Sequence, residues 1–490
     1  MSSWNKVAKS VAVQYVGRVV GLFISLFSTI LITRALGVNG YGQYTTAVAV
    51  ANLIIIFSDL GFFWSTIKNI SDQKETRRVA REITGIRLVV TLILIAIALA
   101  VIWLTSYPPV VKEAFTILAI FILSSGLNNV LVAIHQGTFA MGWPTIADIS
   151  GRLVNLILIA IGVWLKESLL WFMVAMSISA AVNFLINWFV LARRHGPIWP
   201  KISGFQWSKY YGTVVILGVV TLLNALYLKI DVVLLSAYKP AVDVGIYGAA
   251  QKVVEIAMVF QALFVAASFP LLLEKLEQGM DHFRKALSDG FMIVLTIGLP
   301  ISLILVFLSR DIVGFVAGQA FVETSQLSVL GYAITTPVTL AILAGYVLLA
   351  HIDGLFTVSL IATNRLKWLV YTNGLALILN LVLNFALIRH YSYFATAWTT
   401  VATEVFIAAT VTGKAIVTFR PPISGSTVTK VVLASLISLL VLLIPWHIHV
   451  AIQILMILFV YVLVLLVIVP EVRQIIAKYS GGFRHLGAQE

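Results

Sequence analysis

Long apolar segments recur along the whole chain, and they limit its fold more than any other feature. Hydrophobic residues make up 60% of the 490 residues, whereas charged residues make up 11%. Soluble domains carry about 25% charged residues, so a water-soluble fold could not cover this apolar surface. Soluble enzymes, nucleic-acid-binding proteins and disordered scaffolds are therefore excluded, and we expect an integral membrane protein. The absence of cysteine also excludes disulfides and thiolate metal sites.

The apolar segments are long enough to be membrane-spanning helices. A helix needs about 20 apolar residues to cross the roughly 30 Å hydrocarbon core. Windows of that length predict an all-α fold of fourteen transmembrane helices, with no connection long enough for a soluble domain. The predicted spans are 9–36, 44–66, 84–106, 113–138, 146–164, 168–192, 211–238, 245–273, 287–308, 326–361, 366–389, 393–417, 427–445 and 449–469.

Basic residues are distributed unevenly between the two ends of these spans. Most of the 33 Lys and Arg residues fall on the side that holds both termini. The opposite side holds only Lys112, Lys166, Lys239, Arg310 and Arg389. Because Lys and Arg accumulate in cytoplasmic loops, we expect both termini in the cytoplasm and the protein in the plasma (inner) membrane. Topology thus accounts for the net charge of +13, without nucleic acid as a partner.

Two parts of the sequence repeat. Gly42-Gln43-Tyr44 opens the second span and Gly245-Ile246-Tyr247 opens the eighth. Around the fifth and eleventh spans, three residue types recur at one constant offset: Thr138, Trp143 and Asn155 match Thr363, Trp368 and Asn380. A unit of six spans repeated in one orientation predicts two lobes around a central cavity, as in transporters. The expected parts are an N-terminal lobe (1–195), a cytoplasmic linker (196–210), a C-terminal lobe (211–420), and two extra helices with a cytoplasmic tail (421–490).

Several motifs, in this order, resemble those of one family. They are Thr33-Arg34-Ala35-Leu36-Gly37, Gly40-Tyr41-Gly42-Gln43-Tyr44, Ser58-Asp59-Leu60-Gly61, Tyr247-Gly248-Ala249-Ala250-Gln251-Lys252 and Asn380-Leu381-Val382-Leu383-Asn384. The chain resembles Wzx-type polysaccharide flippases of the multidrug/oligosaccharidyl-lipid/polysaccharide exporter superfamily. It departs from them at Ile388–Ser392, where the family often has an Ile-Pro-x-x-Gly turn, and in its long tenth span, which contains Pro337.

Ionisable residues inside the spans are the candidate substrate-binding residues. Such groups are costly in a membrane and generally face a bundle interior or a wet cavity. Arg18, Arg87 and Arg152 form an inner tier of cations, with Asp59 on the second span; Arg34, Lys229 and Lys252 form an outer tier. The rise of a helix places Arg34 roughly 24 Å above Arg18. One arginine side chain can bind two phosphate oxygens at once. Two tiers of cations at different depths therefore suit a lipid-linked diphosphate.

Structural interpretations of the same residues stay open. Arg34 would reach the headgroups, and Arg87 would anchor the start of its span. Asp148 and Arg152, one turn apart, would neutralise each other, and the pairs Lys229–Asp231 and Lys252–Glu255 would join helices. Arg18 is the candidate that these interpretations explain least, because Gln14, Gly21 and Ser25 share its helix face.

The energy source must be an ion gradient or exchange, because the chain has no Gly-x4-Gly-Lys-Ser/Thr phosphate loop. We expect no organic cofactor, with Na⁺ or H⁺ as the coupling ion. Asp231, Asn380, Asn384 and Thr400 would supply oxygen ligands for Na⁺, although such contacts between helices are also commonly structural. Glu404 and Asp353 are the alternative proton carriers.

These observations favour a monomeric flippase, not an enzyme, that moves a polyprenyl-diphosphate-linked oligosaccharide to the outer leaflet by alternating access. Its partners would be the anionic lipid-linked oligosaccharide, membrane lipids and other polysaccharide-assembly proteins. A multidrug/cation antiporter of the same superfamily and a peptidoglycan-precursor flippase remain alternatives. A membrane glycosyltransferase or polymerase is a more distant one, because that function requires a loop with acidic catalytic residues, and the loops here are short and basic.

Overall fold

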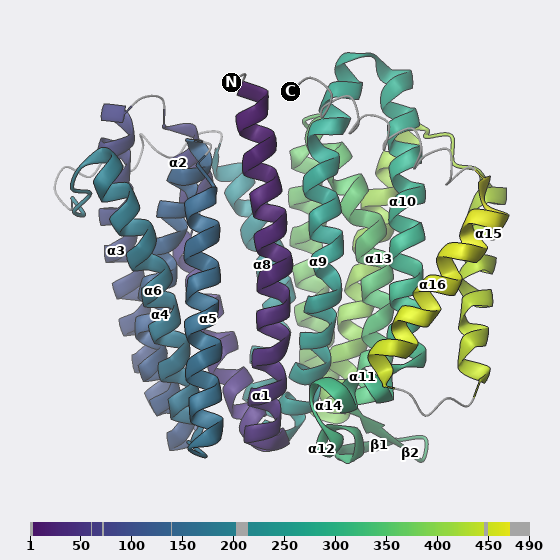
Figure 1. The fold of residues 1–490 in the computed structure, drawn as a ribbon. Helices are drawn as coiled ribbons and strands as arrows, with labels where there is room; N and C mark the ends of the chain where they lie inside the picture. Colours follow the sequence, from purple (N-terminus) through teal and green to yellow (C-terminus); the bar gives the residue numbers. More distant parts are fainter. Residues whose placement is uncertain are drawn as a thin grey trace. The chain divides into compact units, whose positions relative to one another are not determined.

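Long helices make up almost the whole protein (Figure 1). The computed structural model describes residues 3–59, 61–70, 73–138, 140–201, 214–444 and 449–470. Up to the middle of the chain the elements are α1 Ser3–Asp59, α2 Phe62–Lys68, α3 Gln73–Leu104, α4 Pro109–Gly137, α5 Gly142–Trp164, α6 Leu169–His195, α8 Val214–Tyr238 and α9 Ala241–Glu277. The remaining elements are α10 Met280–Phe307, α11 Ser309–Val316, α12 Gln319–Glu323, β1 Ser325–Val329, β2 Tyr332–Thr335, α13 Thr336–Ala362, α14 Leu366–Phe419, α15 Gly425–Ser438, η1 Leu439–Leu443 and α16 Val450–Ile468.

Eleven helical segments of the described chain are long and apolar enough to cross a membrane. Helices satisfy all their backbone hydrogen bonds internally, which is what an apolar surrounding demands. The predicted all-α, multi-pass membrane architecture is therefore confirmed.

The two longest helices, α1 and α14, are each interrupted by one non-helical residue. With 57 residues, α1 would extend about 85 Å if it were straight, far more than a bilayer can cover. It breaks at Gly37, whose φ is 63° and ψ is −175°. The 54-residue α14 breaks at Ser392, whose φ is 48°. A sharp break near the middle divides each helix into two parts of membrane-spanning length.

The predicted span 326–361 is wrong in its first third. Residues Ser325–Thr335 form an antiparallel hairpin of β1 and β2, and α13 begins only at Thr336. Two positive φ angles, 52° at Leu330 and 84° at Gly331, make the tight turn that two-residue hairpins favour. Pro337 then lies in the first turn of α13, where its missing N–H leaves no helical hydrogen bond unmade. The predicted span merges the hairpin with α13, because both segments are apolar and adjacent in the sequence.

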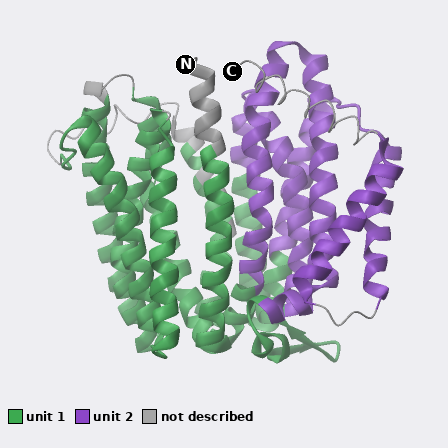
Figure 2. Ribbon diagram, viewed as in Figure 1, with its two compact units in different colours: residues 1–249, 316–336, 373–399 green, residues 250–315, 337–372, 400–490 purple. Residues whose placement is uncertain are grey.

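The helices form two compact units, shown in different colours in Figure 2. Unit 1 comprises residues 1–249, 316–336 and 373–399, and unit 2 comprises 250–315, 337–372 and 400–490. In unit 1, α3, α4 and α6 pack with α1 around Phe115, Leu118 and Met173. In unit 2, α10, α15 and α16 pack around Met292, Val431 and Tyr461. The division into sequential lobes stays a prediction, and much of its linker 196–210 lies outside the described residues.

Within unit 1, the repeated glycine motifs of the sequence lie against each other. A Cβ added at Gly42 would lie 1.7 Å from the main-chain oxygen of Ala241, and one at Gly245 would lie 2.1 Å from the main-chain oxygen of Val38. The backbones of α1 and α9 therefore approach so closely that neither position has room for a side chain. Glycines at such crossings are the usual device for close helix packing in membranes.

We therefore expect Gly245→Ala to destabilise the protein by about 1–3 kcal/mol, the usual cost of overpacking a tight contact. The measurement is the midpoint of thermal unfolding in detergent. Gly413→Ala is the matched control, because Gly413 lies in α14 with nothing within 4 Å of its added Cβ, and alanine there should leave stability equal or slightly higher. Equal midpoints for Gly245→Ala and the wild type would contradict this close contact.

Candidate functional site

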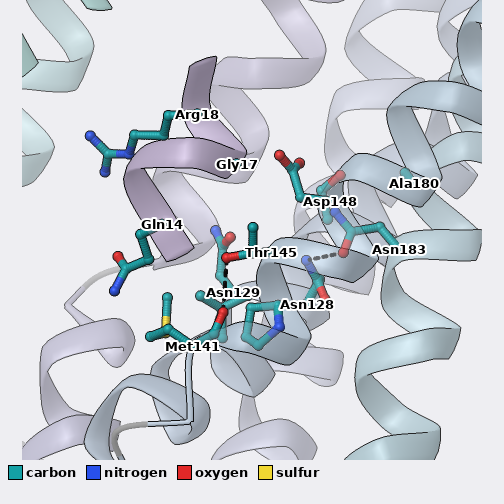
Figure 3. A pocket seen from close by; sticks show the side chains of 13 residues that line it. Gln14, Gly17, Arg18, Asn128, Asn129, Met141, Thr145, Asp148, Ala180 and Asn183 are labelled. Carbon is teal, nitrogen blue, oxygen red and sulfur yellow. Dashed lines mark hydrogen bonds between the residues drawn. The ribbon is translucent and has the colours of Figure 1, made fainter. Parts of the chain in front are cut away.

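A polar cavity of about 370 Å³ lies inside unit 1. Helices α1, α4, α5 and α6 supply its walls. Its polar lining residues are Gln14, Arg18, Ser125, Asn128, Asn129, Thr145, Asp148 and Asn183. In Figure 3 the side chains of Arg18 and Gln14 extend to one side of α1, whereas Asn128, Asp148 and Asn183 lie on its other side. A polar ligand could bind in this cavity, because its lining offers hydrogen-bond partners that replace water between otherwise apolar helices.

Arg18, the leading candidate from the sequence, lines this cavity and is exposed. Gly17, beside it, brings α1 close to α5, since a Cβ there would lie 2.1 Å from Cγ2 of Thr145. No carboxylate of the described chain forms an ion pair with Arg18. Its guanidinium is therefore available to an anionic ligand.

Arg152 lies next to α1 and pairs with a carboxylate on its own helix. Its Nε donates to Oδ2 of Asp148 at 2.8 Å, and both side chains are 44% exposed. The guanidinium packs over Gly21, where an added Cβ would lie 3.2 Å from Nε of Arg152. Arg152 of α5 thus contacts α1 at Gly21, about one turn along that helix from Arg18. With Asp148 matched by Arg152, the charge of Arg18 gives this region its positive surplus.

Three asparagines form a hydrogen-bonded cluster at the inner wall of the cavity. Asn187, which is fully buried, donates from Nδ2 to Oδ1 of Asn128 at 2.9 Å and to Oδ1 of Asn183 at 3.0 Å. Sequence reasoning missed this cluster. Its signal was the pair Asn183 and Asn187, four residues apart on the face of an otherwise apolar span.

Asp59 pairs with Arg87 of α3, and not with a residue of the cavity. Nη1 of Arg87 donates to Oδ1 of Asp59, and the Arg87 side chain has no exposed surface. Its Nε and Nη2 have no partner among the described residues. The interpretation of Arg87 as a boundary anchor is therefore wrong, since an anchoring arginine would reach the headgroups. Asp59 stays a predicted substrate-binding residue, but its contact in this structure is an internal one.

The other predicted cations are distributed over both units. In unit 1, Arg34 is exposed three residues before the break in α1, and Lys229 is half-buried on α8. In unit 2, Nζ of Lys252 pairs with Oε2 of Glu255 at 3.1 Å on α9. The interpretation of Lys252 and Glu255 as a pair that joins two helices is therefore wrong, because both residues lie on α9, three residues apart.

Three of the four predicted sodium ligands meet in unit 1. Asp231 of α8 is buried and accepts from Nδ2 of Asn384 at 2.8 Å and from the hydroxyl of Tyr247 at 3.4 Å. Asn384 also donates to Oδ1 of Asn380 at 3.1 Å. The fourth residue, Thr400, is buried in unit 2. The oxygen Oδ1 of Asn384 has no partner within the described chain, so the group holds an unused buried acceptor.

The chain was compared with known families, curated proteins and solved structures. The family described as polysaccharide biosynthesis protein matches residues 7–276. No curated protein matches. Among solved structures, the lipid II flippase MurJ in its inward closed conformation is similar with a TM-score of 0.73 at 15% identity, over 93% of this chain and 98% of that one.

Two further transporter structures share the fold more loosely. An inward-facing MATE family multidrug resistance transporter of the MOP superfamily gives a TM-score of 0.60 at 13% identity, over 82% of this chain and 97% of that one. A MOP superfamily transporter from Pyrococcus furiosus gives 0.55 at 14% identity, over 84% and 96%. At such identities the similarity establishes the fold. These proteins are transporters and a flippase by their descriptions, and none is a glycosyltransferase.

The Asp59–Arg87 pair predicts a severe loss of stability when only its acid is removed. Asp59→Asn leaves a buried guanidinium without its counter-charge, which costs about 3–5 kcal/mol. We expect low yield and a lowered unfolding midpoint.

The double variant Asp59→Asn/Arg87→Met should recover much of that loss, since it removes both charges from the interior. Folded yield and the unfolding midpoint in detergent provide the measurement. If Asp59→Asn alone were as stable as the wild type, Arg87 would have to find its counter-charge elsewhere.

Proposed function

We propose that this chain, which belongs to the polysaccharide biosynthesis protein family, is a flippase for a polyprenyl-diphosphate-linked oligosaccharide. Its predicted resemblance to Wzx-type flippases is confirmed by the family match over residues 7–276 and by the shared transporter fold. The substrate would pass from the cytoplasmic to the outer leaflet by alternating access.

The observation that carries this proposal is the cavity around Arg18. Arg18 has no counter-ion among the described residues, and it lines a cavity whose Asn128 and Asn183 lie on the other side of α1 from its side chain. A cation and amides on one cavity suit an anionic group that bears a sugar. Arginine can bind diphosphate oxygens with two parallel hydrogen bonds. Arg34, Arg152, Lys229 and Lys252 would meet the diphosphate at other stages of its path, and Asp59 would change partners as the helices move.

The topology behind the proposal is fourteen transmembrane helices with both termini in the cytoplasm. The breaks at Gly37 and Ser392 support the higher count, because each divides a helix that is too long for one crossing. Helix α8, with 25 mostly apolar residues, supports a further crossing. The excess of Lys and Arg on the side of the termini supports this orientation in the inner membrane.

A multidrug antiporter of the same superfamily is the nearest alternative. Pockets for lipophilic drugs are lined mainly by apolar and aromatic side chains. None of the residues described as lining the unit 1 cavity is aromatic, and asparagine is their most frequent type. This lining favours the sugar-bearing substrate. A peptidoglycan precursor also carries a lipid diphosphate and sugars, so it remains a substrate of the same class.

We propose Na⁺ as the coupling ion, held by Asp231, Asn380 and Asn384 of unit 1; Thr400, which belongs to unit 2, stays a prediction. Carboxylate, amide and hydroxyl oxygens are the ligands that hard cations prefer. The unused Oδ1 of buried Asn384, next to the Asp231 carboxylate, supports such a site. When bound, the cation would supply positive charge beside Asp231. The residues themselves would bring α8 and α14 together.

A proton is the second candidate, favoured by a contact in unit 2. The buried side chains of Asp353 on α13 and Glu404 on α14 interact with each other. Two neighbouring carboxyl groups in an apolar interior cannot readily both be ionised, so they would share one proton. Release and uptake of that proton would then drive the cycle.

Arg18 provides the test of the proposed substrate. We expect Arg18→Ala to fold normally, because no described carboxylate depends on it, and to abolish flipping of a lipid-linked diphosphate sugar in proteoliposomes. Arg18→Lys should fold and reduce the flipping rate by about tenfold or more, since lysine keeps the charge but loses the paired donors.

The matched control is Arg284→Ala, a partly exposed arginine that pairs with Asp281 at the start of α10. It should leave flipping unchanged. Full activity in Arg18→Ala would refute the diphosphate role, and aggregation of that variant would indicate a structural role instead.

The coupling ion is tested by exchanging sodium for potassium at equal ionic strength. If Asp231 binds Na⁺, the wild type should lose transport rate and thermal stability without sodium, because a ligand that binds only the folded state stabilises it. Asp231→Ala should not respond to the exchange. Identical responses of the two proteins would remove the sodium site, and dependence on the pH gradient that disappears in Asp353→Asn would identify the proton instead.

A further inference from the structure

We propose that the cavity of unit 1 is a binding site for the acetamido group of a sugar. Asn128 and Asn183 would donate to the carbonyl oxygen of that group, and Asp148 would accept its N–H. This inference rests on the proposed function, because the sugar would be the one linked to the lipid diphosphate. It names which sugar chemistry the site selects.

Asn187 fixes the orientation of the two donor amides. Besides its bonds to the side chains of Asn128 and Asn183, its Nδ2 donates to the main-chain oxygen of Asn183 at 3.2 Å. A main-chain oxygen can only accept, so the Asn187 atom facing it must be the nitrogen. The side-chain oxygens of Asn128 and Asn183 are therefore held by Asn187, away from the cavity. Nδ2 of Asn128 also donates to Oδ1 of Asn183 at 3.4 Å, which uses one of its two N–H groups. The second N–H of Asn128 and the NH₂ group of Asn183 are left for the cavity that both residues line.

Asp148 supplies the complementary acceptor. Its Oδ2 accepts from Nε of Arg152 at 2.8 Å. No donor in the described part of the chain is bonded to its other oxygen, Oδ1, and Asp148 also lines the cavity. The site thus presents neutral donors and a carboxylate oxygen to the same small volume.

An acetamido group matches this arrangement because it carries an acceptor and a donor on neighbouring atoms. Its carbonyl oxygen can take both amide donors, and its N–H can donate to Asp148. A hydroxyl at the same ring position also donates and accepts, but it does both through one oxygen atom close to the ring. It therefore offers no second atom that could reach the donors and the acceptor separately. A polar group left unpaired in a binding site costs affinity. A cavity of about 370 Å³ is also within the usual range for a small ligand.

Binding to two matched probes tests the inference. The probes are a short-chain prenyl diphosphate linked to N-acetylglucosamine and the same lipid linked to glucose. Their affinities are measured by native mass spectrometry on the full chain in nanodiscs. We expect the wild type to bind the acetamido probe about tenfold more tightly, the effect of one or two net hydrogen bonds.

Variants separate the sugar from the diphosphate. Asn183→Ala should bind both probes with equal, low affinity, and Asn183→Asp should prefer glucose, because an oxygen would face the carbonyl. Arg18→Ala should weaken both probes by the same factor and keep their ratio. Asn155→Ala, on α5 outside the cavity lining, should retain the wild-type preference. If Asn183→Ala does not fold, Asn128→Ser makes the same comparison.

The outcomes distinguish this inference from the function beneath it. Equal affinity of the wild type for both probes, with flipping intact, overturns the acetamido site and leaves the flippase. A preference that survives in both Asn183→Ala and Asn128→Ser also overturns the site. Failure to bind either probe, together with no flipping, overturns both.

Discussion

An apolar surrounding cannot solvate a charge, and this constraint governs the polar part of the structure. Each ionised side chain among the long helices needs a counter-charge, water or a ligand. Arg152 has Asp148, Lys252 has Glu255, and the fully buried Arg87 has Asp59. Arg18 differs from these three, since no described carboxylate pairs with it. Its environment is a polar cavity, and this combination makes it the centre of the proposed site.

The same constraint explains why the site is made largely of amides. Asparagine offers donors and an acceptor without a net charge, so several can share one interior region at moderate cost. In unit 1, Nδ2 of Asn187 bonds to the side-chain oxygens of both Asn128 and Asn183. A fully buried residue that directs its neighbours' donors towards a cavity gives that cavity a defined polarity before any ligand enters. Preorganised donors of this kind favour selection of one substituent over another.

Close backbone contact forms a second organising feature. The glycine motifs that open two corresponding spans are repeats in the sequence, and in the structure Gly42 and Gly245 lie against each other's helices. A repeated motif thus serves as both halves of one contact. Small residues let the helices approach without side chains between them.

The sequence alone determined the membrane-spanning helices and the resemblance to flippases, and it singled out Arg18 as a candidate, because apolar length and an isolated charge are local properties. It also indicated that Asp231, Asn380 and Asn384 belong to one site, and the fold brings these three side chains into hydrogen-bond contact. It could not show that Asp59 faces Arg87, that Asn187 orients two other asparagines, or that residues 325–335 form a hairpin. Those depend on which helix faces meet and where a turn reverses the chain. Apolar patterning in a membrane leaves these undetermined, because nearly every face of a span is apolar, and only tertiary packing selects the partners.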